Sequence, residues 1–186
     1  VNRPLENPVY PIPQEMSLEP QVTLQLDASC PILVPEQATE HCLFLARFLV
    51  AEMSDRYGLA LSIRHVAALP AGQPSIVIGT IDNPLVQDRC AAWGVEVTPS
   101  DPGPEGYVLQ ARAEGILVAG SDGPGAFYGL QTLRQLLCEE DDQVAMPGAQ
   151  IRDRPHVPLR GIRLYLPGRE NLAFFRRFVR DFCALY

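Results

Sequence analysis

The sequence predicts an α+β fold, with a mixed or antiparallel sheet and two long helices on one face of that sheet. Segments with the apolar alternation of strands lie on both sides of two helix-like stretches, residues 35–57 and 127–137. Strands and helices mixed in this way, without strict alternation, are typical of α+β domains. The chain has 186 residues, 47% hydrophobic and 20% charged, which is enough for one domain with a core and a fragment of another.

The first half of the chain is predicted to open with an extended lead-in, because residues 1–20 contain five prolines. Apolar alternation and short apolar runs then predict strands at residues 22–26, 32–34, 59–63 and 75–79. The first long helix is expected to begin near Pro35 and to end at Gly58, a residue type common at helix C-caps. Asn83-Pro84 predicts the cap and first turn of a short helix that Gly94 ends.

Residues 105–137 are the stretch around which the rest of the chain is organised. They predict a strand at 107–113, a turn at Glu114-Gly115, a second strand at 116–119 that is covered on both faces, and an amphipathic helix. The helix carries one apolar stripe at helical spacing, made of Phe127, Leu130, Leu133, Leu136 and Leu137. Prolines and glycine predict a surface loop at residues 98–104, and a last strand or the start of a linker is expected at 149–153.

A glycine-rich corner, residues 120–125, joins the second of these strands to the helix. Ser121 or Asp122 can cap the helix, and Pro124 suits its first turn. The corner could instead hold a phosphate, since helix N-termini bind anions. It lacks the Lys-Ser/Thr of a P-loop and the G-x-G-x-x-G spacing of a dinucleotide site, and Asp122 would repel phosphate. A corner built for close packing is therefore the favoured interpretation.

Three groups of motifs together resemble a known family. E-G-Y-x-L, I-x-V and G-x-F-Y-G-x-Q-T-L-R-Q-L-L, all within residues 105–137, resemble the non-catalytic domain that precedes the barrel in family-20 glycoside hydrolases, the β-N-acetylhexosaminidases. Val9–Glu15 resembles that family's opening I-I-P-x-P-Q-E. Residues 151–155 and 159–162 resemble its entry into the first barrel strand. The same domain type also precedes other glycoside hydrolase barrels.

The resemblance implies an accessory α+β domain in residues 1–153 and the start of a catalytic (β/α)8 barrel in residues 154–186. The residue pattern agrees, because 160–166 reads as a strand and 171–186 as a helix with a phenylalanine-rich face that one strand alone cannot cover. We therefore expect a truncated first β-α unit, whose partner is the absent remainder of the barrel. The exposed helix 171–186 could also mediate a dimer.

The resemblance gives Arg169 a role in contacting the terminal sugar in the full-length enzyme. The usual pattern L-D-x-x-R is altered here, with Tyr165 in place of Asp and one extra residue before Arg169, so pairing with a neighbouring loop carboxylate is the alternative. The Asp-Glu pair that the family uses for catalysis is absent, and the chain alone is expected to be inactive. The acidic residues 139–142 are interpreted as a solvated turn.

Composition excludes several other classes of function. The three histidines and five cysteines show no metal-ligand spacing, so we expect free thiols, no metal and no cofactor. All fifteen basic residues are arginines, and those after residue 150 are interleaved with strand and helix patterns, which disfavours nucleic-acid binding. No apolar run is long enough for a bilayer and no signal peptide is visible, so a soluble chain is expected, with the compartment, cytoplasmic or secreted, left open. A stand-alone glycan- or protein-binding module remains the alternative function.

Overall fold

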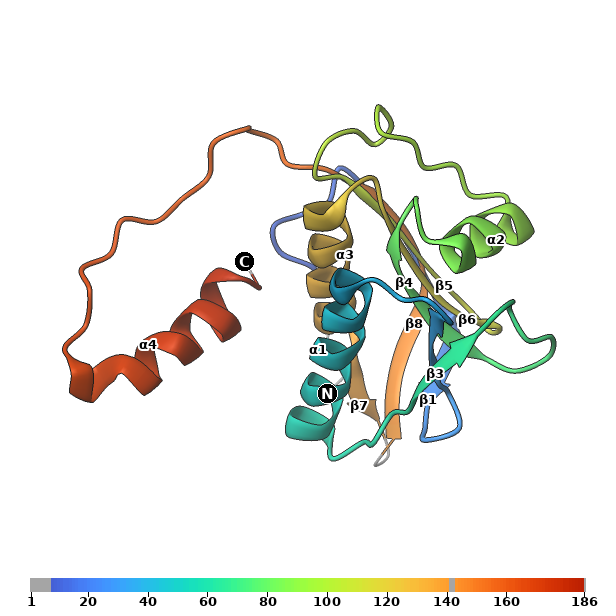
Figure 1. Ribbon diagram of the computed structural model, residues 1–186, viewed down its shortest axis with the longest axis horizontal. Coiled ribbons are helices and arrows are strands. Elements are labelled where there is room, and N and C mark those ends of the chain that lie inside the picture. The colour runs from blue at the N-terminus through green and yellow to red at the C-terminus, as the bar shows by residue number, and fades with distance from the viewer. Residues whose placement is uncertain (1–7, 141–142, 186) are drawn as a thin grey trace. The chain divides into compact units, whose positions relative to one another are not determined.

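The computed structural model describes residues 8–140 and 143–185 (Figure 1). The chain divides into two compact units, Val1–Arg154 and Pro155–Tyr186, called here the sheet domain and the C-terminal segment. Each is described by itself. Within the described ranges, no helix is both long and apolar enough to cross a bilayer.

One mixed sheet forms the sheet domain. Its strands are β1 (Glu15–Leu26), β2 (Ile32–Pro35), β3 (Ile63–Val66), β4 (Ser75–Thr80), β5 (Tyr107–Arg112), β6 (Gly115–Gly120), β7 (Cys138–Glu140) and β8 (Gln143–Asp153). The strand order is β1-β8-β5-β6-β4-β2-β3, and β7 pairs with β8. The half from β1 to β6 is antiparallel, whereas β6, β4, β2 and β3 run parallel.

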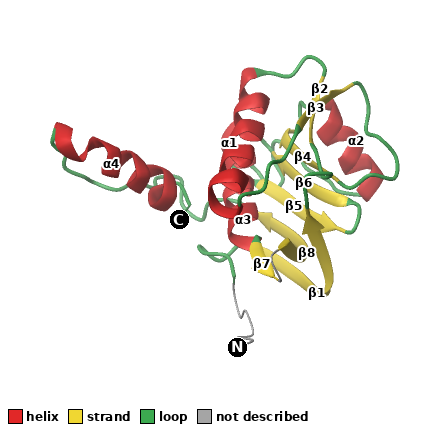
Figure 2. Cartoon of the chain, turned by 90° about the horizontal axis from the view of Figure 1, so that it is seen from below, coloured by secondary structure: helices red, strands yellow, loops and turns green. Residues whose placement is uncertain are grey.

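Two long helices, α1 (Glu40–Tyr57) and α3 (Gly123–Leu136), cover one face of the sheet, as predicted (Figure 2). The larger apolar core lies between these helices and the sheet, and it draws residues from six of the strands. The short helix α2 (Pro84–Trp93) covers the other face over the parallel strands and closes a second, smaller core. Covered on both faces, β4 and β6 are buried along almost their whole length, which explains their uninterrupted apolar sequences.

Local sequence signals fix most helix ends. Gly58 and Gly94 end α1 and α2 in the left-handed conformation, and the Asn83 side chain accepts the N–H of Leu85, all as predicted. The expected start of α1 near Pro35 is wrong. Pro35 ends β2, and α1 begins only after Thr39, because the Thr39 hydroxyl caps the N–H of Cys42.

Strand boundaries were predicted less well than helix ends. The first strand begins at Glu15 and not at residue 22, and the strand expected at 59–63 lies instead at 63–66, where it pairs in parallel with β2. The strand expected at 149–153 is present as the end of a longer strand, β8, and Glu139 and Glu140 of the expected acidic turn belong to β7, which pairs with β8. Glu139 and Glu140 are exposed strand residues, and positions 141–142 lie outside the described residues.

The C-terminal segment is helical at its end but contains no strand between residues 155 and 185. The strand predicted at 160–166 is therefore wrong for this structure, which shows no truncated barrel unit. A strand needs a neighbour for its N–H and C=O groups, and an isolated one finds none. The predicted helix is present as a short turn at Arg169–Asn171, helix α4 (Leu172–Phe178) and a wider turn at Val179–Cys183.

Candidate functional site

The corner where β5, β6 and α3 meet is held by one carboxylate, that of Asp122. Its Oδ1 accepts the N–H of Gly125 at 2.8 Å and so caps α3, and its Oδ2 accepts the N–H of Glu105 at 2.9 Å. Glu105 has a φ of 59°, which is uncommon for a residue with a side chain, and its carboxylate accepts the Tyr128 hydroxyl at 3.3 Å. The capping role that the sequence left open between Ser121 and Asp122 therefore belongs to Asp122.

Small residues bring α3 close to the sheet at this corner. A Cβ added to Gly125 would overlap the carbonyl oxygen of Gly106, and one added to Gly120 would overlap the backbone of Ala126. One turn further along α3, a Cβ on Gly129 would press on the Val118 side chain. The corner is thus filled by its own backbone, and the Asp122 carboxylate already occupies the helix N-terminus. This arrangement agrees with the interpretation as a packing corner and disfavours a phosphate site.

A buried polar network lies under the middle of α3. The Tyr107 hydroxyl is 2.6 Å from Thr132 Oγ1 and donates to Asp153 Oδ2 at 3.3 Å. Burial, reinforced by the nearby Asp153 charge, raises the pKa of Tyr107 well above its usual range, so this tyrosine stays neutral. The network joins β5, α3 and the last residue of β8.

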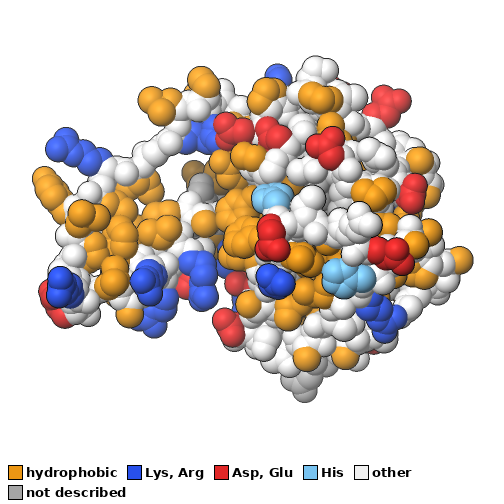
Figure 3. Space-filling model, viewed as in Figure 1, with side chains coloured by type: hydrophobic (Ala, Val, Ile, Leu, Met, Phe, Trp, Pro, Cys, Tyr) orange, Lys and Arg blue, Asp and Glu red, His pale blue; other side chains and the backbone are white. Residues whose placement is uncertain are grey.

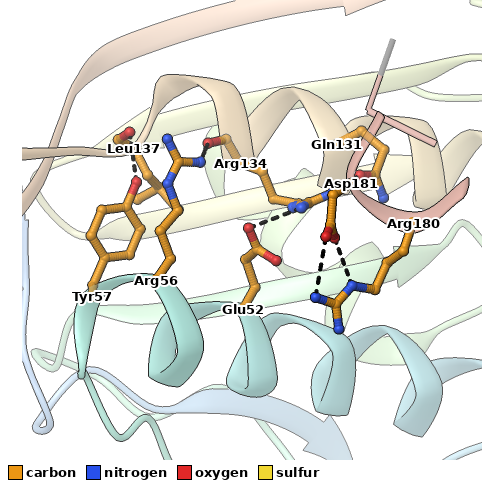
Figure 4. Close-up of polar contacts among 8 residues, drawn as sticks. All are labelled: Glu52, Arg56, Tyr57, Gln131, Arg134, Leu137, Arg180 and Asp181. Atoms are coloured by element: carbon orange, nitrogen blue, oxygen red, sulfur yellow. Dashed lines mark hydrogen bonds and ion pairs between the residues drawn. The ribbon is translucent and has the colours of Figure 1, made fainter. Parts of the chain in front are cut away.

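Ionic contacts link α1 to α3 (Figure 4). The Arg134 side chain is 3% exposed, and its guanidinium lies 2.9 Å from the Glu52 carboxylate and also donates to Gln131 Oε1. A second contact joins the C-terminal ends of the two helices, where the Tyr57 hydroxyl donates to the carbonyl oxygen of Leu137 at 2.9 Å. Because a buried charge that loses its partner costs several kcal/mol, this pair fixes the relative position of the two helices.

Aromatic side chains form a patch on the outer side of the same two helices. It consists of His41, Phe44, Phe48, Phe127 and Tyr128, whose neighbouring ring centroids are 5.9–6.3 Å apart. Phe44, at its centre, is 48% exposed. Figure 3 shows hydrophobic side chains gathered over this region of α1 and α3. The sequence predicts Phe127 on the apolar stripe of its helix, and the structure agrees, because Phe127, Phe48 and Tyr128 are half-buried against the main core. Of the five rings, those of His41 and Phe44 are exposed.

Arg169, the one residue predicted to contact substrate, lies in the C-terminal segment, where it opens the short turn before α4 and is exposed. Among residues 155–185 it has no ion-pair partner, so the alternative pairing with a loop carboxylate is not seen. The ion pair of Arg180 with Asp181, drawn in Figure 4, is internal to this segment.

The described cysteines are all free thiols, and Cys30 and Cys42 are buried in the core. Burial raises the pKa of both Cys30 and Cys90 to about 11, which leaves these thiols neutral and unreactive at neutral pH. No group of three potential metal ligands occurs within 8–140 and 143–185. The side chains described above cap α3, pair α1 with α3 and fill the core.

The comparisons with known proteins agree with this picture. Residues 6–154 match the family described as glycosyl hydrolase family 20, domain 2. A curated β-hexosaminidase from Porphyromonas gingivalis is 39% identical over 67 residues, which are 32% of this chain and 9% of that protein. The chain therefore spans less than a tenth of this relative.

Solved structures share the fold at low sequence identity. A Flavobacterium johnsoniae chitobiase matches with a TM-score of 0.60 and 19% identity, over 88% of this chain and 23% of that one. A mutant Streptomyces plicatus β-hexosaminidase in complex with GlcNAc matches with 0.57 and 20%, over 84% and 28%. CpGH84B matches with 0.63 and 18%, over 94% and 28%.

The family match covers the sheet domain from its lead-in to the end of β8, and the motifs within it account for the Asp122 corner and the α3 contacts. The chain belongs to glycosyl hydrolase family 20, domain 2, the non-catalytic domain of β-hexosaminidases.

Proposed function

We propose that the sheet domain is the scaffold of an exo-acting glycoside hydrolase that removes terminal β-linked N-acetylhexosamine. The observation that carries this proposal is the family match over residues 6–154. Contacts of the motif region support it, because Asp122 caps α3, Thr132 contacts the buried Tyr107, and Arg134 pairs with Glu52, which are packing and positioning roles. In this proposal the chain alone is inactive, and the catalytic Asp-Glu pair lies in another part of the full-length enzyme.

The aromatic patch on α1 and α3 is the surface that we assign to the catalytic barrel. Phe44 and His41 are its exposed members, above three half-buried rings, and exposed aromatic side chains of this kind can be covered by a neighbouring domain. The solved structures that the chain matches are much longer, since it covers only 23–28% of them, which leaves ample protein to cover this patch. Packing of the barrel against Phe44 would keep the two parts of the enzyme in a fixed relation.

The C-terminal segment is assigned to the start of that barrel, which the sequence predicts from residue 154 onward, one residue before the segment begins. Its exposed apolar residues, among them Leu166 and Phe174, support this assignment, because large apolar side chains of this number are usually covered by protein. Arg169 would then contact the terminal sugar, as the family resemblance implies. Alone, the same helix face would favour association of two copies.

The test is turnover of a nitrophenyl N-acetyl-β-glucosaminide by the full-length enzyme and by this chain. We expect hydrolysis by the former and none by the latter. An Arg169→Ala variant of the full-length enzyme should raise KM, with Arg163→Ala, on the same segment but without an implied sugar contact, as its control. Hydrolysis by the 186-residue chain would refute the scaffold role, and an inactive full-length enzyme would refute the substrate class.

The second candidate function is that of the same accessory domain in front of a different glycosidase barrel. CpGH84B carries a GH84 and not a GH20 name, yet it has the highest of the three TM-scores given above. The fold alone therefore does not choose between barrel types. The test compares turnover of the same nitrophenyl substrate by the full-length enzyme and by a variant whose Asp-Glu pair on the later barrel strand is substituted. Loss of turnover in the variant would favour the family-20 barrel over the other type.

A further inference from the structure

Two glutamines hold the extended lead-in, Gln135 at α3 and Gln14 at the end of β8. Val9 is buried in the main core, and the backbone N–H and C=O of Tyr10 are both bonded to the Gln135 side chain on α3, at 2.8 and 2.9 Å. Four residues after Tyr10, at Gln14, the lead-in reaches the end of β8. Residues 9–14 thus run as a strap from α3 to the point where the chain leaves the sheet.

At that exit point, Gln14 makes two hydrogen bonds to consecutive residues. Its backbone N–H donates to Asp153 Oδ1 at 3.0 Å, and its side-chain amide donates to the carbonyl oxygen of Arg154 at 2.8 Å. Asp153 is held from the other side, because its Oδ2 accepts the Tyr107 hydroxyl, which also contacts Thr132. One carboxylate therefore joins the lead-in, β5 and α3.

The ladder between β1 and β8 ends at the same place. Glu15 is the residue opposite Arg152, so Gln14 is the first lead-in residue beyond the ladder, and its side chain extends the pairing by one further acceptor. A single extra hydrogen bond would matter little inside the sheet. Here it acts on Arg154, the last residue of the sheet domain, after which the C-terminal segment begins.

We propose that Gln14 is a positioning residue, which together with Asp153 fixes the place and direction in which the chain leaves the sheet. This inference rests on the proposed function, because the strap is proposed to orient the segment that carries Arg169. The P-Q-E motif of the lead-in and the I-R-D motif at the end of β8 would then act together, although Gln14 and Asp153 lie 139 residues apart in the sequence.

The experiment compares Gln14→Met, which has a similar shape but no donor, with Gln14→Lys, which keeps a donor on a long side chain. Gln150→Met is the matched control, because Gln150 also lies in the β1–β8 pair and its side-chain amide donates to the half-buried Glu19 side chain within that pair. Hydrogen exchange of the amides of residues 152–154 and 156 (residue 155 is proline) and the KM and kcat for the nitrophenyl substrate are measured in the full-length enzyme.

In Gln14→Met, we expect exchange at 152–156 to rise by about three- to tenfold, the effect of one lost hydrogen bond, and KM to rise with kcat nearly unchanged. Gln14→Lys should restore both, and Gln150→Met should change neither. Unchanged exchange in Gln14→Met would overturn the proposal, as would faster exchange with an unchanged KM. If the wild-type enzyme lacks turnover, the proposed function fails, and the exchange measurement alone decides whether Gln14 holds the exit.

Discussion

At the scale of single residues, the motif in α3 consists of residues that contact the sheet and the loop before β5. Gly125 lies under Gly106, Tyr128 reaches Glu105, and Thr132 reaches Tyr107. A family resemblance can be recognised from these residues in the sequence. The sequence does not show which contact each of them makes. Each role depends on a partner about 20 to 25 residues away, on β5 or in the loop before it, and helical periodicity says nothing about such partners.

The first prediction concerns the two glycines of α3. Gly125→Ala should destabilise the chain by roughly 2–4 kcal/mol, because its Cβ would overlap a backbone carbonyl that cannot move without shifting a strand. Gly129→Ala should cost less, since its neighbours are side chains that can adjust and alanine favours helix by about 1 kcal/mol over glycine. Urea unfolding followed by circular dichroism measures both. Equal costs for the two variants would contradict the packing argument.

The second prediction concerns buried thiols and alkaline pH. Cys30 has a pKa raised from 9.0 to about 11 by burial, so in the unfolded chain it ionises near 9 while in the folded chain it stays neutral. Its contribution to stability is therefore fully present below pH 9 and is lost as the pH rises to 11. The unfolding free energy should fall by about 1.4 kcal/mol per pH unit for this group within that window.

The check is a comparison with Cys30→Ala across pH 8 to 11. The variant will be less stable at every pH because it leaves a small cavity, so the informative quantity is the slope and not the absolute stability. Its slope should be shallower than that of the wild type by the contribution of one group. Parallel curves would show that Cys30 is not held neutral by the core.

At the scale of elements, those parts of the fold that depend on local signals could be predicted. The caps at Gly58, Asn83 and Gly94 are examples, because a cap is decided by residues within one helical turn. The position of β3 and the β7–β8 hairpin could not be predicted, since strands are fixed by partners distant in sequence. Residues 160–166 show the converse: a strand-like pattern without a neighbour forms no strand.

The third prediction compares two helix caps. Asp122 satisfies two N–H groups, those of Gly125 and Glu105, whereas Thr39 satisfies only that of Cys42. Asp122→Ala should therefore cost about 2–3 kcal/mol, against about 1 kcal/mol for Thr39→Ala. Denaturant midpoints of the two variants at neutral pH provide the measurement. A smaller loss in Asp122→Ala than in Thr39→Ala would mean that the Glu105 contact contributes nothing.

At the scale of the whole molecule, the two units differ in how they are stabilised. Both apolar cores draw their buried residues from the sheet domain alone, between Val9 and Ile151. The C-terminal segment keeps large apolar residues exposed, with Phe174 at 64% and Phe182 at 50%. A domain whose core is complete within itself should fold without its neighbour, and a segment with no core of its own should not.

The last prediction follows from this difference. A chain ending at residue 154 should unfold at the same urea midpoint as the 186-residue chain, because it retains every buried member of both cores. It should also elute as a monomer in size-exclusion chromatography, whereas the longer chain should associate through α4 in a concentration-dependent way. The variant Phe174→Ser combined with Phe182→Ser in the longer chain is the control, and it should restore the monomer without changing the midpoint. A loss of more than about 1 kcal/mol on truncation would show that the segment stabilises the domain, since independent folding units contribute additively to within less than that.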